Sequence, residues 1–413
     1  MSLYLALAIL LALSTVTALV KARRLHYGAI PWFFAGWLTG ELAWFHLAWS
    51  LLLSALVVMG GGVESSAGRW GLGLFLFSWI GLAWLHLQAL NTGAILESAL
   101  RDALGKNYRG DIPLTRQHVL DAALDTRAWM RPFRMRRPGV RVHSNIRYGE
   151  HGIRNTLDVY QPQEAREGGY PVLLQVHGGG WMVGAKHQQG LPLMYHLASR
   201  GWLCVACNYR LSPRSPFPHH IVDVKRSIAW IREHAAEYGG NADFLAITGG
   251  SAGGHLAALA ALTPNHPDWQ QGFEDVDTRV QASVPFYGVY DFLDSEGIRG
   301  TMSMEDILAR YVMQSRSSEA RETWQQASPI EQVRPDAPPT FLLQGTHDSL
   351  VWVEEARHFA NRLRAVSEQV VAYGELPGAQ HAFEVFHSVR TDQSLEAVTG
   401  FLEWCHARWL AER

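Results

Sequence analysis

The sequence predicts an α/β protein, with a mostly parallel sheet flanked by helices over residues 149–413 and a helical transmembrane module over residues 1–92. Long apolar runs are confined to the first part of the chain. From about residue 150, short apolar runs alternate with helical patterns, as in parallel sheets that are buried on both faces. Charged residues make up 18% of the 413 residues and there are 16 Trp. Globular domains have about 25% charged residues, so this composition is typical of a chain that lies partly in lipid.

The module is expected to contain three membrane-spanning helices, at residues 3–20, 30–58 and 70–90. A helix needs about 20 apolar residues to cross the hydrocarbon core. Glu41, His46 and His86 fall within these runs, and an ionisable group at membrane depth is a functional hypothesis by default. Because no matching acid–base chain follows, we prefer interhelical hydrogen bonds or positions near the interface for these three side chains.

Charge placement predicts the orientation of the module. Nothing basic precedes the first run, whereas Lys21, Arg23 and Arg24 follow it, so the run is expected to span the membrane and not to be a cleaved signal peptide. The positive-inside rule then places this loop in the cytoplasm. Three crossings give a multi-pass membrane protein with a cytoplasmic catalytic domain. If the first run does not span, that domain lies outside.

A basic connecting region over residues 93–148 follows the module. It contains six arginines between positions 127 and 141: Arg127, Arg131, Arg134, Arg136, Arg137 and Arg141. Such a cluster can rest on anionic lipid, at about 1 kcal/mol per charge near the surface, or it can be a solvated face with local salt bridges. Both interpretations stay open.

The alternation of strands and helices defines the domain from residue 149 onward. Strands are expected at TLDVYQP, PVLLQV, LCVACNY, FLAIT, VQASVPFYG, TFLLQ and QVVAYGEL, and helices at 223–238, 353–366 and 394–410, among others. This order implies a parallel sheet with right-handed crossovers. Cys204 and Cys207 lie inside one of the apolar runs, so we interpret them as small core residues and not as a redox pair.

The strongest chemical motif is G-x-S-x-G, formed by Gly249 to Gly253 around Ser251. It follows the strand FLAIT and opens the helix GHLAALAAL, the strand–turn–helix context of a nucleophile elbow. A serine on such a sharp turn projects its hydroxyl above the sheet. Glycines at positions 249 and 253 would let the strand and the helix approach each other, so Ser251 is the predicted nucleophile.

A second motif, His177-Gly178-Gly179-Gly180, follows the strand PVLLQV. It is an HGGG-type oxyanion loop, whose backbone N–H groups stabilise the negative oxygen of a tetrahedral intermediate. We predict Gly179, Gly180 and Ala252 as the donors, with Gly178 as a substitute for one of the two loop glycines. His177 is expected to orient the loop.

Asp348 and His381 are the predicted acid and base of the triad, because in this arrangement an Asp or Glu and then a His follow the serine along the chain. Each comes directly after a strand, where sites of open α/β sheets form. His347 and His387 compete for the role of base. His347 adjoins the acid and is poorly placed to reach Ser251, and His387 is expected on the following helix.

These segments together resemble the hormone-sensitive-lipase type of esterases in the α/β-hydrolase superfamily, and their pattern is close to bacterial carboxylesterases and to BD-FAE and kynurenine-formamidase-like hydrolases. The resemblance covers about residues 150 to 410, and the segments that carry it are HGGGWMVGAKHQ, NYRLSPRSPFPHHIVDVKRS, ITGGSAGGHLAALAA, GTHDSLV and QHAF. It implies an eight-stranded mostly parallel sheet, a serine acyl-enzyme, and no metal or other cofactor. Tyr209, Arg210, Pro216, Pro218 and Asp223 match a structural segment of the family. One departure is Gly250, since the family often has an acidic residue before the nucleophile.

The predicted function is therefore a membrane-anchored serine carboxylic-ester hydrolase that acts on a hydrophobic or lipid-like ester. An amidase, a formamidase or an acyltransferase shares all the motifs, and a non-catalytic membrane scaffold is a further alternative. The segment 290–335 is a candidate cap over an acyl pocket or a plain surface helix; its apolar residues are Met302, Met304, Ile307, Leu308, Tyr311 and Met313. Membrane lipids and a small-molecule or lipid ester are the expected partners. The net charge of -2 gives no indication of nucleic-acid binding, and the oligomeric state is left open.

Overall fold

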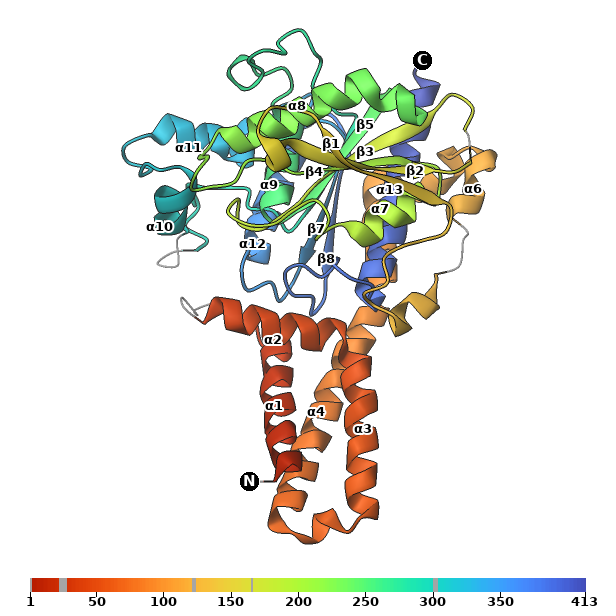
Figure 1. Cartoon of the computed structure of the whole chain (residues 1–413), viewed down its shortest axis with the longest axis vertical. Coiled ribbons are helices and arrows are strands. Elements are labelled where there is room, and N and C mark those ends of the chain that lie inside the picture. Colours follow the sequence, from red (N-terminus) through yellow and green to blue (C-terminus); the bar gives the residue numbers. More distant parts are fainter. Residues whose placement is uncertain (1, 22–27, 121–123, 165, 300–303) are drawn as a thin grey trace.

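The computed structural model describes the whole chain except residues 1, 22–27, 121–123, 165 and 300–303. The predictions that concern Arg23, Arg24 and Met302 lie outside the described residues. The protein has a helical stalk that carries an α/β head (Figure 1). The N-terminal end of the chain lies toward the free tip of the stalk, and the C-terminus lies on the far side of the head.

The head is built on one eight-stranded sheet with the order β1-β2-β4-β3-β5-β6-β7-β8. The pairs β1–β2 and β2–β4 are antiparallel and all the others are parallel, so the expectation of a mostly parallel eight-stranded sheet is confirmed. The strands are β1 (Val140–Arg147), β2 (Thr156–Pro162), β3 (Tyr170–Val176), β4 (Leu203–Cys207), β5 (Gly240–Gly250), β6 (Ala282–Phe286), β7 (Thr340–Gly345) and β8 (Val371–Leu376).

Helices cover both faces of this sheet. On one face, α8 (His219–His234), α9 (Ala252–Leu262) and α12 (Val353–Val366) pack against alternate strand residues such as Leu174. On the other face lie α5 (Thr92–Leu104), α7 (Leu191–Ala198) and α13 (Val389–Ala411). Cys204 and Cys207 are buried, free and part of different face clusters, so their interpretation as core residues is confirmed. Shorter helices are α6 (Leu114–Leu120), α10 (Glu305–Ile307) and α11 (Arg321–Ala327).

The helix α5 was expected to belong to the basic connecting region, but it packs inside the head. Its Leu96 and Leu100 are fully buried against the core of one face, and Leu96 lies against Gly374 of β8. Since α5 continues almost directly from the stalk helix α4 (Ser66–Leu90), one rod of helix joins the stalk to the sheet.

The stalk differs from the sequence expectation in its second helix. Residues 30–58 do not form one helix: α2 (Ala29–Glu41) and α3 (Ala43–Met59) meet at Leu42 with a bend of 79°. The bend lets α2 lie across the base of the head while α3 runs down the stalk beside α1 (Leu3–Leu19) and α4 (Figure 1). Among the described helices, Ser66–Leu104 is long and apolar enough to cross a membrane, the bent α2–α3 pair is a second such span if it is counted as one, and α1 is a shorter apolar helix.

The ionisable residues Glu41, His46 and His86 differ in their surroundings. Glu41 lies at the base of the head, where its Oε1 is 3.0 Å from Nη1 of Arg390 in α13. This buried ion pair joins the end of α2, next to the bend at Leu42, to α13 of the head. His46 accepts a hydrogen bond from the indole of Trp49 at 3.1 Å, and His86 is partly exposed.

Candidate active site

Ser251 stands on the sharp turn between β5 and α9. Its φ of 59° and ψ of -123° are those of a strained position for a residue other than glycine. The flanking glycines are required by close approach: a Cβ at Gly249 would lie 2.6 Å from the carbonyl oxygen of Val176 in β3, and one at Gly253 would collide with the same oxygen. The elbow therefore folds as the motif predicts.

The glycine that departs from the family pattern, Gly250, has a tertiary explanation. A Cβ at this position would lie 2.6 Å from the hydroxyl of Tyr287. That hydroxyl donates a hydrogen bond to the buried carboxylate of Glu384, and the ring of Tyr287 lies 4.5 Å from that of His381. Burial raises the pKa of Glu384. The space of an acidic side chain beside the nucleophile is thus taken by a tyrosine, and Glu384 brings a carboxyl group to the same place from another loop.

The glycine loop after β3 lies directly against Ser251, the predicted nucleophile. A Cβ at Gly178 would be 3.1 Å from Cβ of Ser251, and Gly179 and Gly180 both have positive φ. The N–H of Gly178, the alternative oxyanion donor, donates to Oε1 of Gln189 at 2.6 Å. This amide is therefore already hydrogen-bonded. Gly179 and Gly180 remain as the loop candidates, together with the first amide of α9, at Ala252, whose N–H has no acceptor within its own helix.

His177 is buried directly after β3 and contacts the glycine loop. Its ring stacks on Tyr209 with centroids 4.4 Å apart, and its Nδ1 lies 2.8 Å from the carbonyl oxygen of Gly178. The hydroxyl of Tyr209 donates to the carbonyl of His177 at 2.9 Å. Burial lowers the pKa of His177 to about 4, so the ring is neutral at physiological pH. These contacts agree with an orienting role.

Asp348 and His381 meet at the carboxyl ends of β7 and β8. Nδ1 of His381 lies 2.7 Å from Oδ2 of Asp348. The carboxylate also accepts from the backbone N–H groups of Leu350 and Val351, at 2.9 and 2.8 Å, and from the amide of Gln344 at 3.0 Å. Both side chains are almost excluded from solvent, with exposures of 0% and 5%. The acid thus holds one nitrogen of the imidazole, so that Nε2 is the nitrogen left for proton transfer.

Gln380 joins the two loops that carry these residues. Its Oε1 accepts from the N–H of Ser349 at 2.7 Å and from the N–H of His381 at 2.9 Å. One side-chain oxygen therefore sets the spacing between the acid loop and the base loop.

Replacing Gln380 by alanine is expected to lower kcat for ester hydrolysis by on the order of tenfold to a hundredfold, because a small displacement of reacting groups is costly. The loss of two hydrogen bonds should lower the free energy of unfolding by about 2 kcal/mol. Steady-state kinetics and thermal denaturation measure both effects. Gln332→Ala, which removes a hydrogen bond to the carbonyl of Gln325, is the matched control, and equal kinetics for the two variants would contradict the role of Gln380.

Neither competing histidine adjoins Asp348 in the way that His381 does. Nδ1 of His347 lies 3.0 Å from the carbonyl oxygen of Ala18 in α1, and burial lowers the pKa of its ring. His387 pairs with Asp392 at 2.7 Å. It precedes α13 and does not lie on it, which corrects the expected placement.

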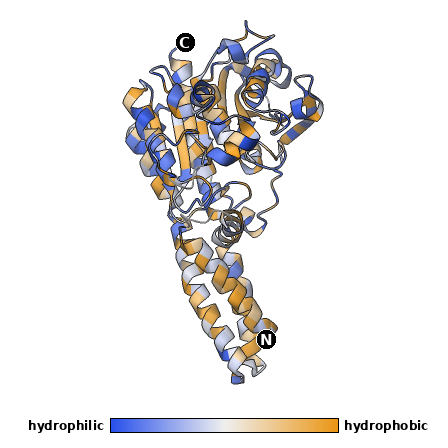
Figure 2. Ribbon diagram, turned by 90° about the vertical axis from the view of Figure 1, so that its left-hand side faces the viewer, coloured by the Kyte–Doolittle hydropathy of each residue, from blue (hydrophilic) through white to orange (hydrophobic). Residues whose placement is uncertain are grey.

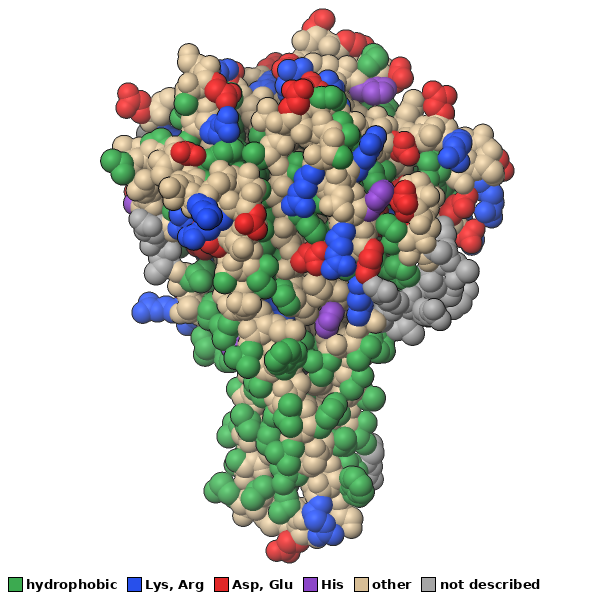
Figure 3. All heavy atoms as spheres, turned by 180° about the vertical axis from the view of Figure 1, so that it is seen from behind, with side chains coloured by type: hydrophobic (Ala, Val, Ile, Leu, Met, Phe, Trp, Pro, Cys, Tyr) green, Lys and Arg blue, Asp and Glu red, His purple; other side chains and the backbone are tan. Residues whose placement is uncertain are grey.

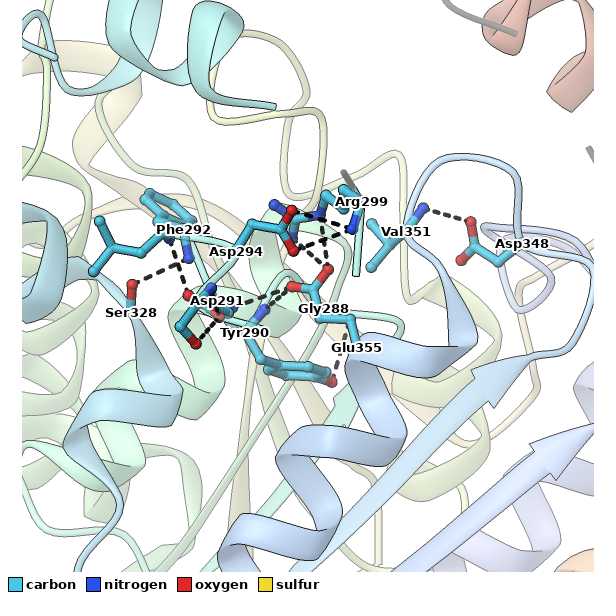
Figure 4. Close-up of polar contacts among 12 residues, drawn as sticks. Gly288, Tyr290, Asp291, Phe292, Asp294, Arg299, Ser328, Asp348, Val351 and Glu355 are labelled. Atoms are coloured by element: carbon cyan, nitrogen blue, oxygen red, sulfur yellow. Dashed lines mark hydrogen bonds and ion pairs between the residues drawn. The ribbon is translucent and has the colours of Figure 1, made fainter. Parts of the chain in front are cut away.

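The segment 290–335 is tied to the start of α12 by a buried polar network (Figure 4). Glu355, near the start of α12, accepts from the N–H groups of Tyr290 and Asp291 at 2.6 and 3.1 Å and from Nε of Arg299 at 3.1 Å. Farther along, Leu308 and Met313 are buried in the core, whereas Ile307 is exposed. Much of the segment is thus anchored to the head. Among the described residues, no three His, Cys, Asp or Glu side chains are grouped as metal ligands.

Several residues around His381 could not be assigned from the sequence. Tyr287, Gln380 and Glu384 contact the histidine or its loop, and Phe33 of α2 approaches its ring. Gln380 and Glu384 stand within four positions of His381, so proximity was the one available signal for them. Phe33 and Tyr287 are distant in sequence, and only folding brings them to the histidine.

The head has the α/β-hydrolase fold, which solved esterases share, and relatives that are 40–46% identical identify the chain as a serine hydrolase that acts on esters. A solved esterase of Thermogutta terrifontis with bound butyrate is 25% identical, with a TM-score of 0.52 over 68% of this chain and 95% of that one. Esterase B of Lactobacillus rhamnosis, 23% identical, shares the fold with a TM-score of 0.54 over 77% of this chain and 99% of that one.

The BD-FAE family model matches residues 157–363, and the chain belongs to this family. A probable carboxylic ester hydrolase of Mycobacterium tuberculosis, LipM, is 46% identical over 80% of this chain and 77% of its own length. The esterase LipQ of the same organism is 40% identical over 93% of this chain and 87% of its own length.

Proposed function

We propose that Ser251, Asp348 and His381 form the catalytic triad of a membrane-anchored carboxylic-ester hydrolase. The observation that carries the triad is the 2.7 Å contact between His381 Nδ1 and Asp348 Oδ2, beside the elbow that presents Ser251. His381 Nε2 takes the proton of Ser251 as the hydroxyl attacks the ester carbonyl, and Asp348 stabilises the imidazolium. The imidazolium then protonates the leaving alcohol, and water releases the acid from the acyl-enzyme by the same steps.

The amides of Gly179, Gly180 and Ala252 are the proposed oxyanion donors. Their preorganised N–H groups would meet the charge that develops on the carbonyl oxygen, and loss of one such donor costs about 3 kcal/mol. The N-terminus of α9 adds a favourable field for that charge, since helix N-termini carry a partial positive charge.

The stalk is the support for membrane anchoring. The ribbon of its helices is mostly hydrophobic to neutral in hydropathy (Figure 2), and in the face shown by Figure 3 charged side chains appear at the far tip and over the head but not along the shaft. Leu52, Ile80 and Trp84 are 57–76% exposed on this shaft. A bare apolar surface of this kind marks contact with lipid or with protein, and α4, with 25 residues, is about 37 Å long, enough for a hydrocarbon core of about 30 Å.

For the orientation we propose a cytoplasmic head. Lys21, Arg101 and Lys106 lie on the head side of the stalk, whereas the tip has Glu64 and Arg69. The positive-inside rule favours the cytoplasm for the side that is richer in Lys and Arg. A membrane-anchored catalytic centre favours hydrophobic or lipid-like esters as substrates.

Labelling of the detergent-solubilised full chain with a fluorophosphonate, followed by peptide mapping, tests the proposal. The expected result is one adduct, on Ser251, because only an activated serine reacts rapidly with the phosphorus centre. Heat-denatured protein is the control and should not react. Absence of an adduct on folded protein, or an adduct on another serine, would contradict the assignment.

A further inference from the structure

The helix α2 has one face that is buried against the protein and one that is exposed. Phe33, Gly36, Gly40 and Glu41 are buried against the rest of the protein. Ile30, Phe34 and Leu38, spaced four residues apart, are exposed, and Phe34 is 51% exposed. The helix lies across the top of the apolar stalk (Figure 1), at the end of the proposed membrane-spanning helices nearest the head.

The buried face of α2 packs on the loop that carries the predicted base. The ring of Phe33 meets that of His381 edge-on with centroids 6.0 Å apart, and Phe33 itself is 8% exposed. A Cβ at Gly36 would lie 3.5 Å from Nε2 of Gln380, the side chain that joins the acid and base loops. Through these contacts a helix of the stalk touches both the catalytic histidine and the residue that positions it.

Polar contacts hold the C-terminal end of α2, and the end of α1, against the head. At the C-terminal end of α2, Glu41 pairs with Arg390 and also accepts from the hydroxyl of Ser388 at 2.7 Å. At the end of α1, the carbonyl oxygen of Ala18 lies 3.0 Å from Nδ1 of His347, the neighbour of Asp348. Lys21 pairs with Glu354 of α12 at 2.8 Å. The loops of both Asp348 and His381 are therefore contacted by the stalk.

Phe133, an exposed aromatic residue of the connecting region, is linked to α2 through the buried Phe386. Trp37 packs on Phe386 at 5.2 Å, and Phe386 packs on Phe133 at 5.3 Å, which is itself 68% exposed. Phe133 stands between Arg131 and Arg134. An apolar ring flanked by arginines is the pattern of a segment that rests at a lipid headgroup boundary.

We propose that α2 is an interfacial helix that completes the active site: its outer face, with Phe133, rests on the lipid surface, and Phe33 on its inner face positions His381. The catalytic centre is then held at the headgroup level. This inference rests on the proposed function and deepens it, since it assigns as substrates esters whose carbonyl lies at the bilayer interface.

Phe33→Ala tests the inner face of α2. We expect kcat for a short soluble ester, p-nitrophenyl butyrate, to fall about threefold to tenfold with KM unchanged, because an aromatic contact of this strength corresponds to that factor in rate. Phe33→Leu, which keeps most of the bulk, should recover most of the rate. The matched control is Ile30→Ala on the outer face of the same helix, where the side chain is 62% exposed, and it should keep the kcat of the unmodified protein toward this ester.

A thermal melt of each variant separates positioning from unfolding. Equal kcat for Phe33→Ala and the unmodified protein would overturn the role of Phe33. If instead both Phe33→Ala and Phe33→Leu lose activity in proportion to lost folded protein, the contact is structural and the inference is also overturned.

A fluorescent label tests the outer face. Cys204, Cys207 and Cys405 are buried, so an NBD dye attached to Phe34→Cys would report one position in the full chain reconstituted in phosphatidylcholine–phosphatidylglycerol vesicles. We expect a blue-shifted emission that a lipid-borne quencher reduces and aqueous iodide does not. Glu237→Cys, on the far exposed surface of the head, should show the opposite.

Quenching of the dye at position 34 by iodide alone would overturn the interfacial placement. Fluorophosphonate labelling of the same samples keeps the two proposals apart. If Ser251 reacts while the dye at position 34 is in water, the hydrolase assignment stands and the interfacial role of α2 fails. If Ser251 does not react, the proposed function fails first.

Discussion

Replacing Ser251 by alanine is expected to lower kcat for ester hydrolysis by on the order of 10⁵- to 10⁶-fold, the effect of removing a nucleophile that acts together with its base. The variant loses one oxygen atom from a partly buried position, while the backbone interactions of the elbow are kept. The N–H of Ser251 still donates to the carbonyl of Phe286 at 3.0 Å, and the flanking glycines are unchanged. The fold should therefore survive the substitution, and the midpoint of thermal denaturation should stay within a few degrees of the unmodified protein.

Hydrolysis of p-nitrophenyl butyrate in detergent measures this effect over a wide range of rates. Ser199→Ala, which removes an exposed serine near the end of α7, is the control and should keep full activity. If Ser251→Ala retained activity comparable to this control, another residue would be the nucleophile. The residual activity of the variant is also informative, because the oxyanion donors alone are expected to give some acceleration over water.

Replacing Glu41 by alanine is expected to destabilise the protein by about 3 to 5 kcal/mol, the effect of breaking a buried ion pair by removing one partner. Arg390 is completely buried. Besides Glu41, its guanidinium donates to the carbonyl oxygens of Leu85 and Pro377, at 3.3 and 3.0 Å. Without Glu41 a positive charge would stay in a place that water does not reach. The stalk and the head are therefore expected to separate before the sheet unfolds.

Thermal denaturation in detergent, followed together with hydrolysis, measures this loss. The double variant Glu41→Met/Arg390→Met should recover most of the stability, since replacing a buried ion pair by apolar side chains is often neutral. Arg408→Ala breaks an exposed pair with Glu412 in the same helix and should cost at most about 1 kcal/mol. If Glu41→Ala cost no more than this surface control, the pair would not hold the stalk to the head.

Each predicted triad residue is marked by a pattern in the residues directly around it in the sequence. Ser251 lies in a five-residue motif between a strand and a helix, and Asp348 and His381 each follow an apolar strand. Strand–turn–helix geometry and the crowding at Gly249 and Gly253 depend on residues that are close along the chain or in adjacent strands. The sequence is therefore sufficient to propose these residues, along with the parallel sheet that brings their loops to one edge.

Other parts of the site depend on contacts between distant residues, and only the tertiary structure decided them. The amide of Gly178 is engaged because Gln189 folds back onto it, and Gly250 is small because Tyr287 occupies the space beside it. In both cases the local sequence permits several arrangements, and the packing of another segment selects one.

The sequence by itself determined the class of fold, seven of the eight strands and the motif residues, because periodicity and turn chemistry are local, whereas β1 (Val140–Arg147) lies in the stretch expected to be a connecting region. It did not determine the path of the stalk. The apolar pattern over residues 30–58 is that of one continuous helix, whereas the folded chain bends at Leu42, next to a buried pair between Glu41 and Arg390, which are 349 positions apart. Hydrophobic periodicity carries no information about the pairing of Glu41 with Arg390. The contact between Phe33 and His381 likewise forms only in the folded chain.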